Sequence, residues 1–547
     1  MYLGFRRLAL IGSVLGLALI VAGILFLNRI AVFTSGPASR PFNAGLVGKI
    51  STLEPAILNS MQERIISSAI YEGLVYYEQN ASMVKPLLAH SWDYSADGKS
   101  LTIFLKPDVL FHNGKKLGAG DVKKAWEQNF VTASEWSNAS LFLTITGARD
   151  LLEGKNPEIS GIEVVNDQTL KITFNEPNAA FVYMLTNPMF WVYDLDDQVV
   201  PAPGTGQFIL EKNENNQKYI LSRNERYHLA PPLLETINIT VFANDYQALG
   251  EYQAGKLDYL DTIPLKEIKN IRNNDQYQKR LIEKPVLSTY SIGFNLNKAP
   301  FAGNYLLRRA INYAVDREAI IENVMGGASR PAKSAIPAGV AGYNREMPGY
   351  SYNPQKALQL LQEAGLTEAD KQKPLYLVYN NNEGHRLVAQ SVAQQLRDIG
   401  LNVETQAMDW DSYKEELQQM NLTLFRLEWY ADYPDPDSFL YSLFHSCQTG
   451  MSNFTGYFNP QVDKILDTSR AEVISHQERI KLLNRAEQII VDDAPCLWLF
   501  QGQTAKLIGK DVKKLDIDNM GMINWATLEL KPASQAAADS LGENRQN

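Results

Sequence analysis

The segment 375–430 constrains the fold more than any other part of this chain. LYLVYN (375–380) is typical of a strand, and a helical pattern follows it and ends at Gly400. LNVETQAM (401–408) predicts a second strand, and NLTLFRLEWY (421–430) predicts a third. The apolar residues of the helical pattern recur at i, i+4, i+8 and i+11, and are Val388, Val392, Leu396 and Ile399.

Strand, helix and strand with short joins form a βαβ unit, whose strands run parallel. In parallel sheets, ligands gather outside the carboxyl ends of the strands. His385 lies just beyond the first strand, at the start of the helix, where an anion is favoured. Asp432 follows the third strand. If the first and third strands are parallel, we expect His385 and Asp432 to open onto one crevice.

Shorter patterns predict four further elements. Residues 91–106 form a hairpin around an Asp-Gly turn, and residues 168–174 form another strand. Residues 119–130 form a helix with an aspartate suited to its N-terminus. Residues 304–324 predict one amphipathic helix whose apolar face packs in the core.

Residues 8–27 form an apolar stretch without charge, directly after Arg6 and Arg7. About 20 such residues cross a bilayer as a helix. The arginines favour an N-terminus in the cytoplasm, so the rest of the chain lies outside. We expect residues 1–33 to be an uncleaved anchor on the outer face of the bacterial cytoplasmic membrane. The alternative is a cleaved signal peptide, which would place the chain in the periplasm.

Two polar segments flank the folded part of the chain. Residues 34–44 predict a linker, and residues 533–547 predict a disordered tail. The length of 547 residues predicts two or three domains. The net charge of -9 argues against a nucleic-acid partner, because such partners reward clustered Lys and Arg.

The chain has two cysteines, Cys447 and Cys496. They could pair in an oxidising compartment, but so few cysteines mean that the fold does not rely on disulfides. We favour unpaired thiols.

No local signature of catalysis is present. The phosphate-binding G-x-x-x-x-G-K-[ST], a complete G-x-G-x-x-G, G-x-S-x-G and H-E-x-x-H are all missing from the sequence. The six histidines show no metal-ligand spacing, and the aspartates of residues 432–437 are spaced wrongly for a calcium loop. We therefore predict a binding protein that catalyses no reaction and holds no cofactor or metal.

The segment EWYADYPDPDSFL (428–440) is too broken by proline for a helix and too acidic for a core. Either it is a solvated loop, or it presents a carboxylate to a positive group. Asp432 stands between an aromatic strand end and Pro434, which packing explains poorly, so it is the predicted carboxylate. Asp435 and Asp437 are expected to be solvated or to cap the next helix.

Several segments, taken in order, resemble the extracellular solute-binding proteins of peptide ABC transporters, family 5. The resemblance spans about residues 45–530. The segments are STLEPAILNS, IYEGLVYYE, LLAHSWDYSADGKSLTIFLKPDVLFHNGKKLGAGDV, PGTGQF, SRNERYH, YQAGKLDYL, IGFNLNKAPFAGNYLLRRAINYAVDREAII, YNPQKALQLLQEAGL and WYADYPDPDSFL.

The resemblance implies the two-lobed α/β fold of periplasmic binding proteins, in its type II, three-domain peptide-binding class. A hinge joins the lobes, and the ligand lies in the cleft between them. Lobe 1 then has a core domain built from residues 45–72, 205–288 and 513–532, and an additional domain from residues 73–204. Lobe 2 comprises residues 289–512.

The resemblance also implies roles for single residues. The family's W-x-A-D-Y-type loop supplies an aspartate for the ligand's α-ammonium group, and Asp432 stands at that position. In oligopeptide-type members of the family, a histidine at a helix start and an arginine six residues before this aspartate can bind the peptide's carboxylate. His385 and Arg426 stand at the matching positions of this sequence. The predicted ligand-binding residues are Asp432, Arg426, His385, Trp429, Tyr430 and Tyr433.

Structural alternatives stay open for four of these residues. Arg426 either binds ligand or pairs with Glu428 or Asp409. His385 either contacts ligand or caps its helix, and Trp429 and Tyr430 either contact ligand or pack within the lobe.

The implied function is capture of short peptides, of two to five residues, by a monomeric receptor that delivers them to an ABC permease. Binding of another solute by the same fold, such as an oligosaccharide, a nickel complex or a haem-type chelate, is the first alternative. A surface protein that senses peptides without transport is the second.

Overall fold

The computed structural model describes residues 40–532 apart from 80–81, 134–137, 198 and 472–474. Residues 8–27 and the predicted tail 533–547 lie outside these ranges. Within the ranges, no helix has the length and apolar character needed to cross a membrane.

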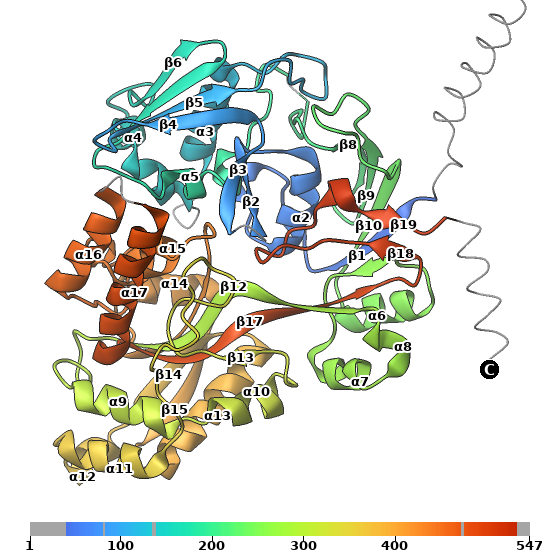
Figure 1. Ribbon diagram of the computed structural model, residues 1–547. Helices are drawn as coiled ribbons and strands as arrows, with labels where there is room; N and C mark the ends of the chain where they lie inside the picture. Colours follow the sequence, from blue (N-terminus) through green and yellow to red (C-terminus); the bar gives the residue numbers. More distant parts are fainter. Residues whose placement is uncertain (1–39, 80–81, 134–137, 198, 472–474, 533–547) are drawn as a thin grey trace, which may run out of the picture.

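The chain folds into two lobes that share one large mixed sheet (Figure 1). Its strand order is β15-β14-β16-β12-β17-β11-β1-β10-β9-β8, and β13 pairs with β17 beside this path. The bounds are β1 (Phe42–Val47), β8 (Phe208–Glu214), β9 (Lys218–Arg223), β10 (Thr236–Phe242), β11 (Tyr259–Leu260), β12 (Leu281–Phe294), β13 (Arg330–Pro331), β14 (Leu375–Asn380), β15 (Val403–Met408), β16 (Leu424–Tyr430) and β17 (Cys496–Ile508).

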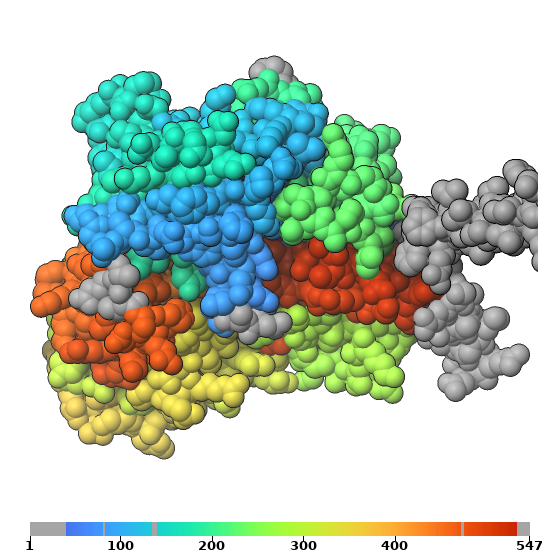
Figure 2. Space-filling model, turned by 45° about the horizontal axis from the view of Figure 1, so that its top comes forward, coloured from blue at the N-terminus to red at the C-terminus, as the bar shows by residue number. Residues whose placement is uncertain are grey.

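Two long neighbouring strands, β12 and β17, connect the lobes (Figure 1). They pair antiparallel on both sides of a register shift between Pro285 and Thr289. The end of β12 near Leu281 lies with the lobe 1 strands, whereas its other end pairs with β16 in lobe 2. The lobes pack against each other along a seam (Figure 2).

Lobe 1 also holds a separate antiparallel sheet, in the order β4-β5-β7-β6, which α3 accompanies (Figure 1). The smaller pairs are β2 with β3 and β18 with β19. The bounds are β2 (Val75–Glu78), β3 (Met83–Pro86), β4 (Ala89–Tyr94), β5 (Ser100–Leu105), β6 (Ile162–Asn166), β7 (Thr169–Thr173), β18 (Val512–Lys514), β19 (Glu529–Leu530) and α3 (Ala119–Thr132).

The remaining helices cover these sheets. Their bounds are α2 (Met61–Ile70), α4 (Ala148–Leu152), α5 (Phe181–Met184), α6 (Asp245–Gln253), α7 (Ile268–Arg272), α8 (Asp275–Gln278), α9 (Tyr305–Ala314), α10 (Arg317–Val324), α11 (Pro354–Glu363), α12 (Glu368–Gln372), α13 (Glu383–Asp398), α14 (Trp410–Gln418), α15 (Asp437–Phe444), α16 (Pro460–Ala471) and α17 (His476–Asp493).

The predicted βαβ unit is confirmed. β14 runs parallel to both β15 and β16, and α13 connects β14 to β15. The side chain of Asn382 caps α13, accepting from the backbone N–H groups of Gly384 and His385. The predicted apolar face of α13 is buried through Val388, Val392 and Leu396. The sequence did not predict α14, which leads from β15 to β16.

Two predicted boundaries are wrong. The segment 304–324 is not one helix, because α9 ends at Ala314 and α10 begins at Arg317. Asp316 interrupts it, since its side chain accepts from the backbone N–H of Ala319 at 2.9 Å and caps α10. The predicted linker also extends too far, because Phe42 already belongs to β1 and is fully buried. The hairpin, the helix at 119 and the strand at 168 are confirmed.

The cap at Asp316 predicts a stability change. Asp316→Ala removes the acceptor for a backbone N–H group, so we expect the free energy of unfolding to fall by about 1 kcal/mol. Urea denaturation measures this change. Glu318→Ala, in the exposed first turn of the same helix, is the matched control. Equal effects of the two substitutions would contradict the role of Asp316 as the cap.

Candidate functional site

The loop that follows β16 contains the predicted carboxylate. β16 ends at Tyr430, and α15 begins at Asp437 with Pro436 at its N-cap position. Between them the chain carries Asp432 and Asp435, so three aspartates lie close together in sequence. Their environments differ sharply, and this difference defines the site.

Asp435 and Asp437 are fully buried and paired with arginines. Asp435 accepts two hydrogen bonds from the guanidinium of Arg479, at 2.7 and 2.8 Å. Asp437 accepts two from Arg470, at 2.8 and 2.6 Å. Burial raises the pKa of Asp437, but the charge and hydrogen bonds of Arg470 outweigh it and lower that pKa overall.

The prediction that these two aspartates are solvated is therefore wrong. The arginines come from α16 and α17, more than thirty residues downstream, where no local pattern links them to the loop. The N-cap position of α15 belongs to Pro436, but the carboxylate of Asp435 accepts from the backbone N–H of Asp437, the first residue of that helix, at 2.9 Å.

Tyr433 fixes the loop against lobe 1. Its side chain is only 1% exposed, and it belongs to the hydrophobic cluster that fills lobe 1. Its hydroxyl donates to the carboxylate of Asp437 at 2.6 Å. It also lines a cavity of about 600 Å³ between the lobes, together with Asn178 and Arg470. A ligand contact by Tyr433 stays a prediction.

Two main-chain hydrogen bonds hold Asp432 in place. Its N–H donates to the hydroxyl of Ser438 at 2.9 Å, and its carbonyl accepts from the side-chain amide of Asn187 in lobe 1 at 2.8 Å. Within the described residues its carboxylate takes part in no hydrogen bond or ion pair. Burial raises the pKa of Asp432 to about 7, although the positive charge of Arg64 acts in the opposite direction.

Arg426 points to the same sheet face as Glu428 and Tyr430, because alternate residues of a strand share a face. Its guanidinium donates to Glu428 at 2.6 Å and lies 5.3 Å from the ring centre of Tyr290. The pairing with Glu428 that the sequence left open is therefore present. The Nε–H of Arg426 is buried without a partner among the described residues, so the group keeps capacity for a further acceptor.

His385 lies beside this arginine. Its Nδ1 is 3.3 Å from the hydroxyl of Tyr290. Burial, and then the charge of Arg426, lower the pKa of His385 to about 3, so the imidazole is neutral at physiological pH. The idea that His385 caps its helix is wrong, because Asn382 performs that role.

The two aromatic residues at the end of β16 differ in exposure. Trp429 is partly buried against the lobe 2 core, and its indole N–H donates to the carbonyl of Ser438 at 2.8 Å. Tyr430 is 52% exposed, and the negative charge of Glu428 raises the pKa of its hydroxyl. Packing therefore explains the presence of Trp429, whereas the ring of Tyr430 is accessible to a ligand. Their roles in ligand binding stay predictions.

Asp432 and His385 follow parallel neighbouring strands, as expected, but no described contact joins them. Asp432 lies against Asn187 of lobe 1, whereas Tyr290 contacts both His385 and Arg426. Two separate clusters of polar residues therefore flank β16. That Asp432 and His385 open onto one crevice stays a prediction. Sequence reasoning missed Asn187, whose contact with Asp432 joins residues far apart in the chain and has no local signal.

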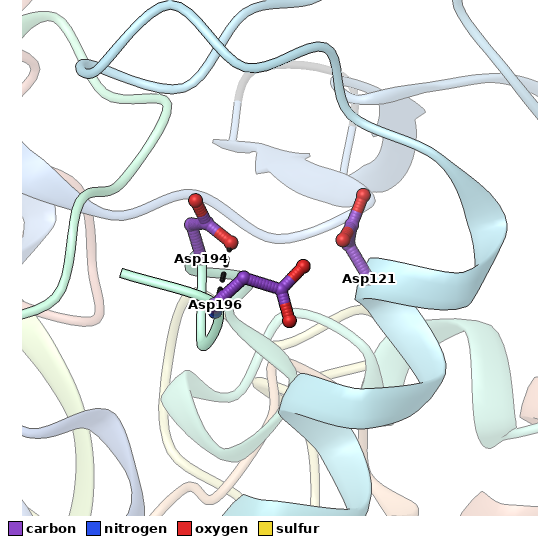
Figure 3. Close-up of side chains that lie close together, drawn as sticks. All are labelled: Asp121, Asp194 and Asp196. Atoms are coloured by element: carbon purple, nitrogen blue, oxygen red, sulfur yellow. Dashed lines mark hydrogen bonds between the residues drawn. The ribbon is translucent and has the colours of Figure 1, made fainter. Parts of the chain in front are cut away.

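Asp121, Asp194 and Asp196 form the one carboxylate cluster, among the described residues, close enough to hold a metal (Figure 3). The ammonium group of Lys115 donates to all three, at 2.7 Å each. Burial alone would lower the pKa of Lys115, but these bonds raise it. The ammonium group of Lys115 therefore supplies positive charge at this cluster, at the place where a metal ion would otherwise lie.

Cys447 and Cys496 are free thiols, as favoured from the sequence. Cys496 is buried at the start of β17, whereas Cys447 is exposed in the 3-10 turn Ser446–Gln448.

Comparison with known proteins defines the class. Residues 83–451 match the family model of bacterial extracellular solute-binding proteins, family 5 Middle. The chain belongs to this family of solute-binding proteins.

Among its relatives, heme-binding protein A of Haemophilus influenzae is 29% identical over 79% of this chain and 81% of its own. The oligopeptide-binding protein OppA of Bacillus subtilis is 27% identical over 81% of this chain and 84% of its own. The unliganded open form of the periplasmic murein tripeptide-binding protein MppA superposes with a TM-score of 0.77. It is 24% identical and covers 91% of this chain and 99% of its own, which confirms the two-lobed fold.

Because the ion pair between Arg479 and Asp435 is buried, we expect the loss of one partner to destabilise the fold strongly. Arg479→Met leaves Asp435 charged and unpaired inside the protein, so we expect a loss of about 3–5 kcal/mol in the free energy of unfolding. Adding Asp435→Asn should restore part of this loss, because the orphaned charge disappears. Urea denaturation measures both variants. Lys116→Met, which breaks an exposed pair with Asp108, is the control and should change little.

The raised pKa of Asp432 predicts a pH dependence. In the unfolded chain this group titrates near pH 4, so the folded state binds a proton more tightly between about pH 4 and 7. Its stabilising contribution is complete below about pH 4 and is lost as the pH rises through about 7. We therefore expect Asp432→Asn to stabilise the ligand-free protein increasingly from pH 5 to pH 8, by on the order of 2–4 kcal/mol at the upper end.

Urea denaturation at pH 5, 6, 7 and 8 tests this expectation, with Asp411→Asn as the exposed control. A stability difference between wild type and Asp432→Asn that does not vary with pH would contradict an unpaired, buried carboxylate.

Proposed function

We propose that this protein is an extracytoplasmic receptor that captures short peptides between its lobes and delivers them to an ABC permease, without catalysing a reaction. One observation carries the proposal. Asp432 lies between the lobes, is partly buried, and its carboxylate has no cation bound to it in the described part of the protein. A buried carboxylate is costly unless a positive partner reaches it, and the α-ammonium group of a peptide is such a partner.

Arg426 and His385 serve the opposite end of the ligand in this proposal. Arg426 offers its unpartnered Nε–H and, on release from Glu428, a fork suited to a carboxylate. Six residues separate it from Asp432, about 20 Å along an extended strand. Since an extended peptide spans about 3.3 Å per residue, and the arginine side chain shortens the span, this spacing suits peptides of up to about five residues.

The peptide main chain would bind in extended form, through hydrogen bonds like those of an added strand. Tyr430 offers an exposed ring near the amine end of the ligand. Relatives with names such as oligopeptide-binding protein and dipeptide-binding protein support this ligand class. The apolar residues 8–27 would keep the receptor at the outer face of the membrane, close to its permease.

Calorimetric titration of the full-length protein tests the proposal, after unfolding and refolding to remove bound ligand. We expect Ala-Ala-Ala to bind, and both N-acetylation of the peptide and Asp432→Asn to weaken binding at least 100-fold, because each removes one half of the charge pair. Asp411→Asn, an exposed carboxylate, should leave the affinity unchanged.

Haem and maltotriose complete the ligand panel, since one relative is named a heme-binding protein. Binding of haem or sugar by folded protein that ignores every peptide would overturn the proposal. Equal affinity for acetylated and free peptides would overturn the role of Asp432.

A further inference from the structure

Tyr290 contacts both His385 and Arg426. It lies in β12, which stands between β16 and β17 in the large sheet (Figure 1). Its side chain is 4% exposed, and its ring stacks on Phe500 of β17 with 4.7 Å between the ring centres. The guanidinium of Arg426 lies 5.3 Å from the ring centre, and the hydroxyl lies 3.3 Å from Nδ1 of His385. The packing of the ring therefore fixes the hydroxyl beside the imidazole.

The hydroxyl and the imidazole can form their hydrogen bond in two ways. Either the O–H of Tyr290 donates to a bare Nδ1, or a protonated Nδ1 donates to the hydroxyl oxygen. In the second case the O–H needs another acceptor. Among the described residues the hydroxyl has no hydrogen-bond partner besides His385. Arg426 is a donor only, and the carboxylate of Glu428 accepts from Arg426.

The first arrangement satisfies both groups. A buried donor without an acceptor is costly, so the O–H of Tyr290 donates to Nδ1. The imidazole is neutral at physiological pH, since burial and the charge of Arg426 lower its pKa to about 3. A neutral imidazole with a bare Nδ1 carries its proton on Nε2. His385 is partly exposed, and its Nε2 has no partner in the part of the chain that the structure describes.

The tautomer of His385 decides which ligand groups it can bind. With the proton on Nε2, the nitrogen that Tyr290 leaves free is a hydrogen-bond donor. A carboxylate or carbonyl oxygen of the ligand matches this donor. The other tautomer would present a lone pair at Nε2 and repel a carboxylate. Because the imidazole is neutral, it contributes a directed hydrogen bond rather than a charge.

We propose that Tyr290 is a positioning residue, which holds His385 in the Nε2–H form so that this group donates to the carboxylate of the bound peptide. The hydroxyl carries this role, because the ring alone supplies the contact with Arg426. The inference deepens the peptide-binding function proposed above and rests on it.

Heteronuclear NMR of ligand-free, full-length protein with isotope-labelled histidine tests the tautomer. Protonated and bare ring nitrogens differ widely in chemical shift, and their couplings to the ring hydrogens distinguish Nδ1 from Nε2. The signals of His385 are identified by their loss in His385→Gln. We expect a protonated Nε2 in wild type and a mixture of tautomers in Tyr290→Phe. A protonated Nδ1 in wild type would overturn the proposal.

Calorimetric titration of the full-length protein compares Ala-Ala-Ala with its C-terminally amidated form. We expect Tyr290→Phe to weaken binding of the free acid about tenfold, and of the amide by no more than about threefold, because the amide can turn an N–H toward a bare Nε2. A merely structural defect would weaken both peptides equally. Tyr350→Phe removes a different hydroxyl of lobe 2, which donates to the carbonyl of Val491, and as the matched control should change neither affinity.

A double-mutant cycle tests whether Tyr290 acts through His385. In the His385→Gln background, Tyr290→Phe should change the affinity for Ala-Ala-Ala by no more than about twofold. A further loss of about tenfold there, or equal losses for the free and amidated peptides in Tyr290→Phe, would overturn the positioning role while peptide binding by wild type stands. If folded wild type binds neither peptide, the proposed function fails and the ligand role of Tyr290 fails with it.

Discussion

The paired arginines and aspartates of the interlobe loop are the interaction on which the site depends. Arg479 and Arg470 hold the fully buried carboxylates of Asp435 and Asp437 through two hydrogen bonds each. These bonds join the loop after β16 to α16 and α17, so a segment with two prolines gains a single conformation. Asp432 lies at the start of this fixed segment, and its position between the lobes follows from the pairs behind it.

Most charged groups of the two lobes have partners, whereas the carboxylate of Asp432 has none among the described residues. The ammonium group of Lys115 donates to three aspartates, and Glu63 accepts from four backbone N–H groups. A partly buried carboxylate without a partner lowers the stability of the ligand-free protein. In the function proposed above, the same free energy becomes available as affinity when a cationic group of the ligand reaches Asp432.

Local patterns predicted the parts of the fold that depend on local physics. The repeat of Val388, Val392 and Leu396 predicted α13, and the parallel strands around it followed. Asp316 shows the limit of this approach, because the apolar repeat continues through a cap that splits the helix. The environment of Asp435 could not be predicted, since its partner comes from a distant helix and only the assembled fold brings them together. Asn187, which contacts Asp432 from lobe 1, was missed for the same reason.

The connection between the lobes has a consequence for how they move. β12 and β17 cross side by side and remain hydrogen-bonded before and after the shift between Pro285 and Thr289. At the crossing Gly502 approaches Ser288 so closely that a Cβ atom would lie 2.1 Å from its hydroxyl oxygen. A two-stranded ribbon resists stretching and sliding but twists readily. We therefore expect relative motion of the lobes to twist this ribbon rather than to slide one strand along the other.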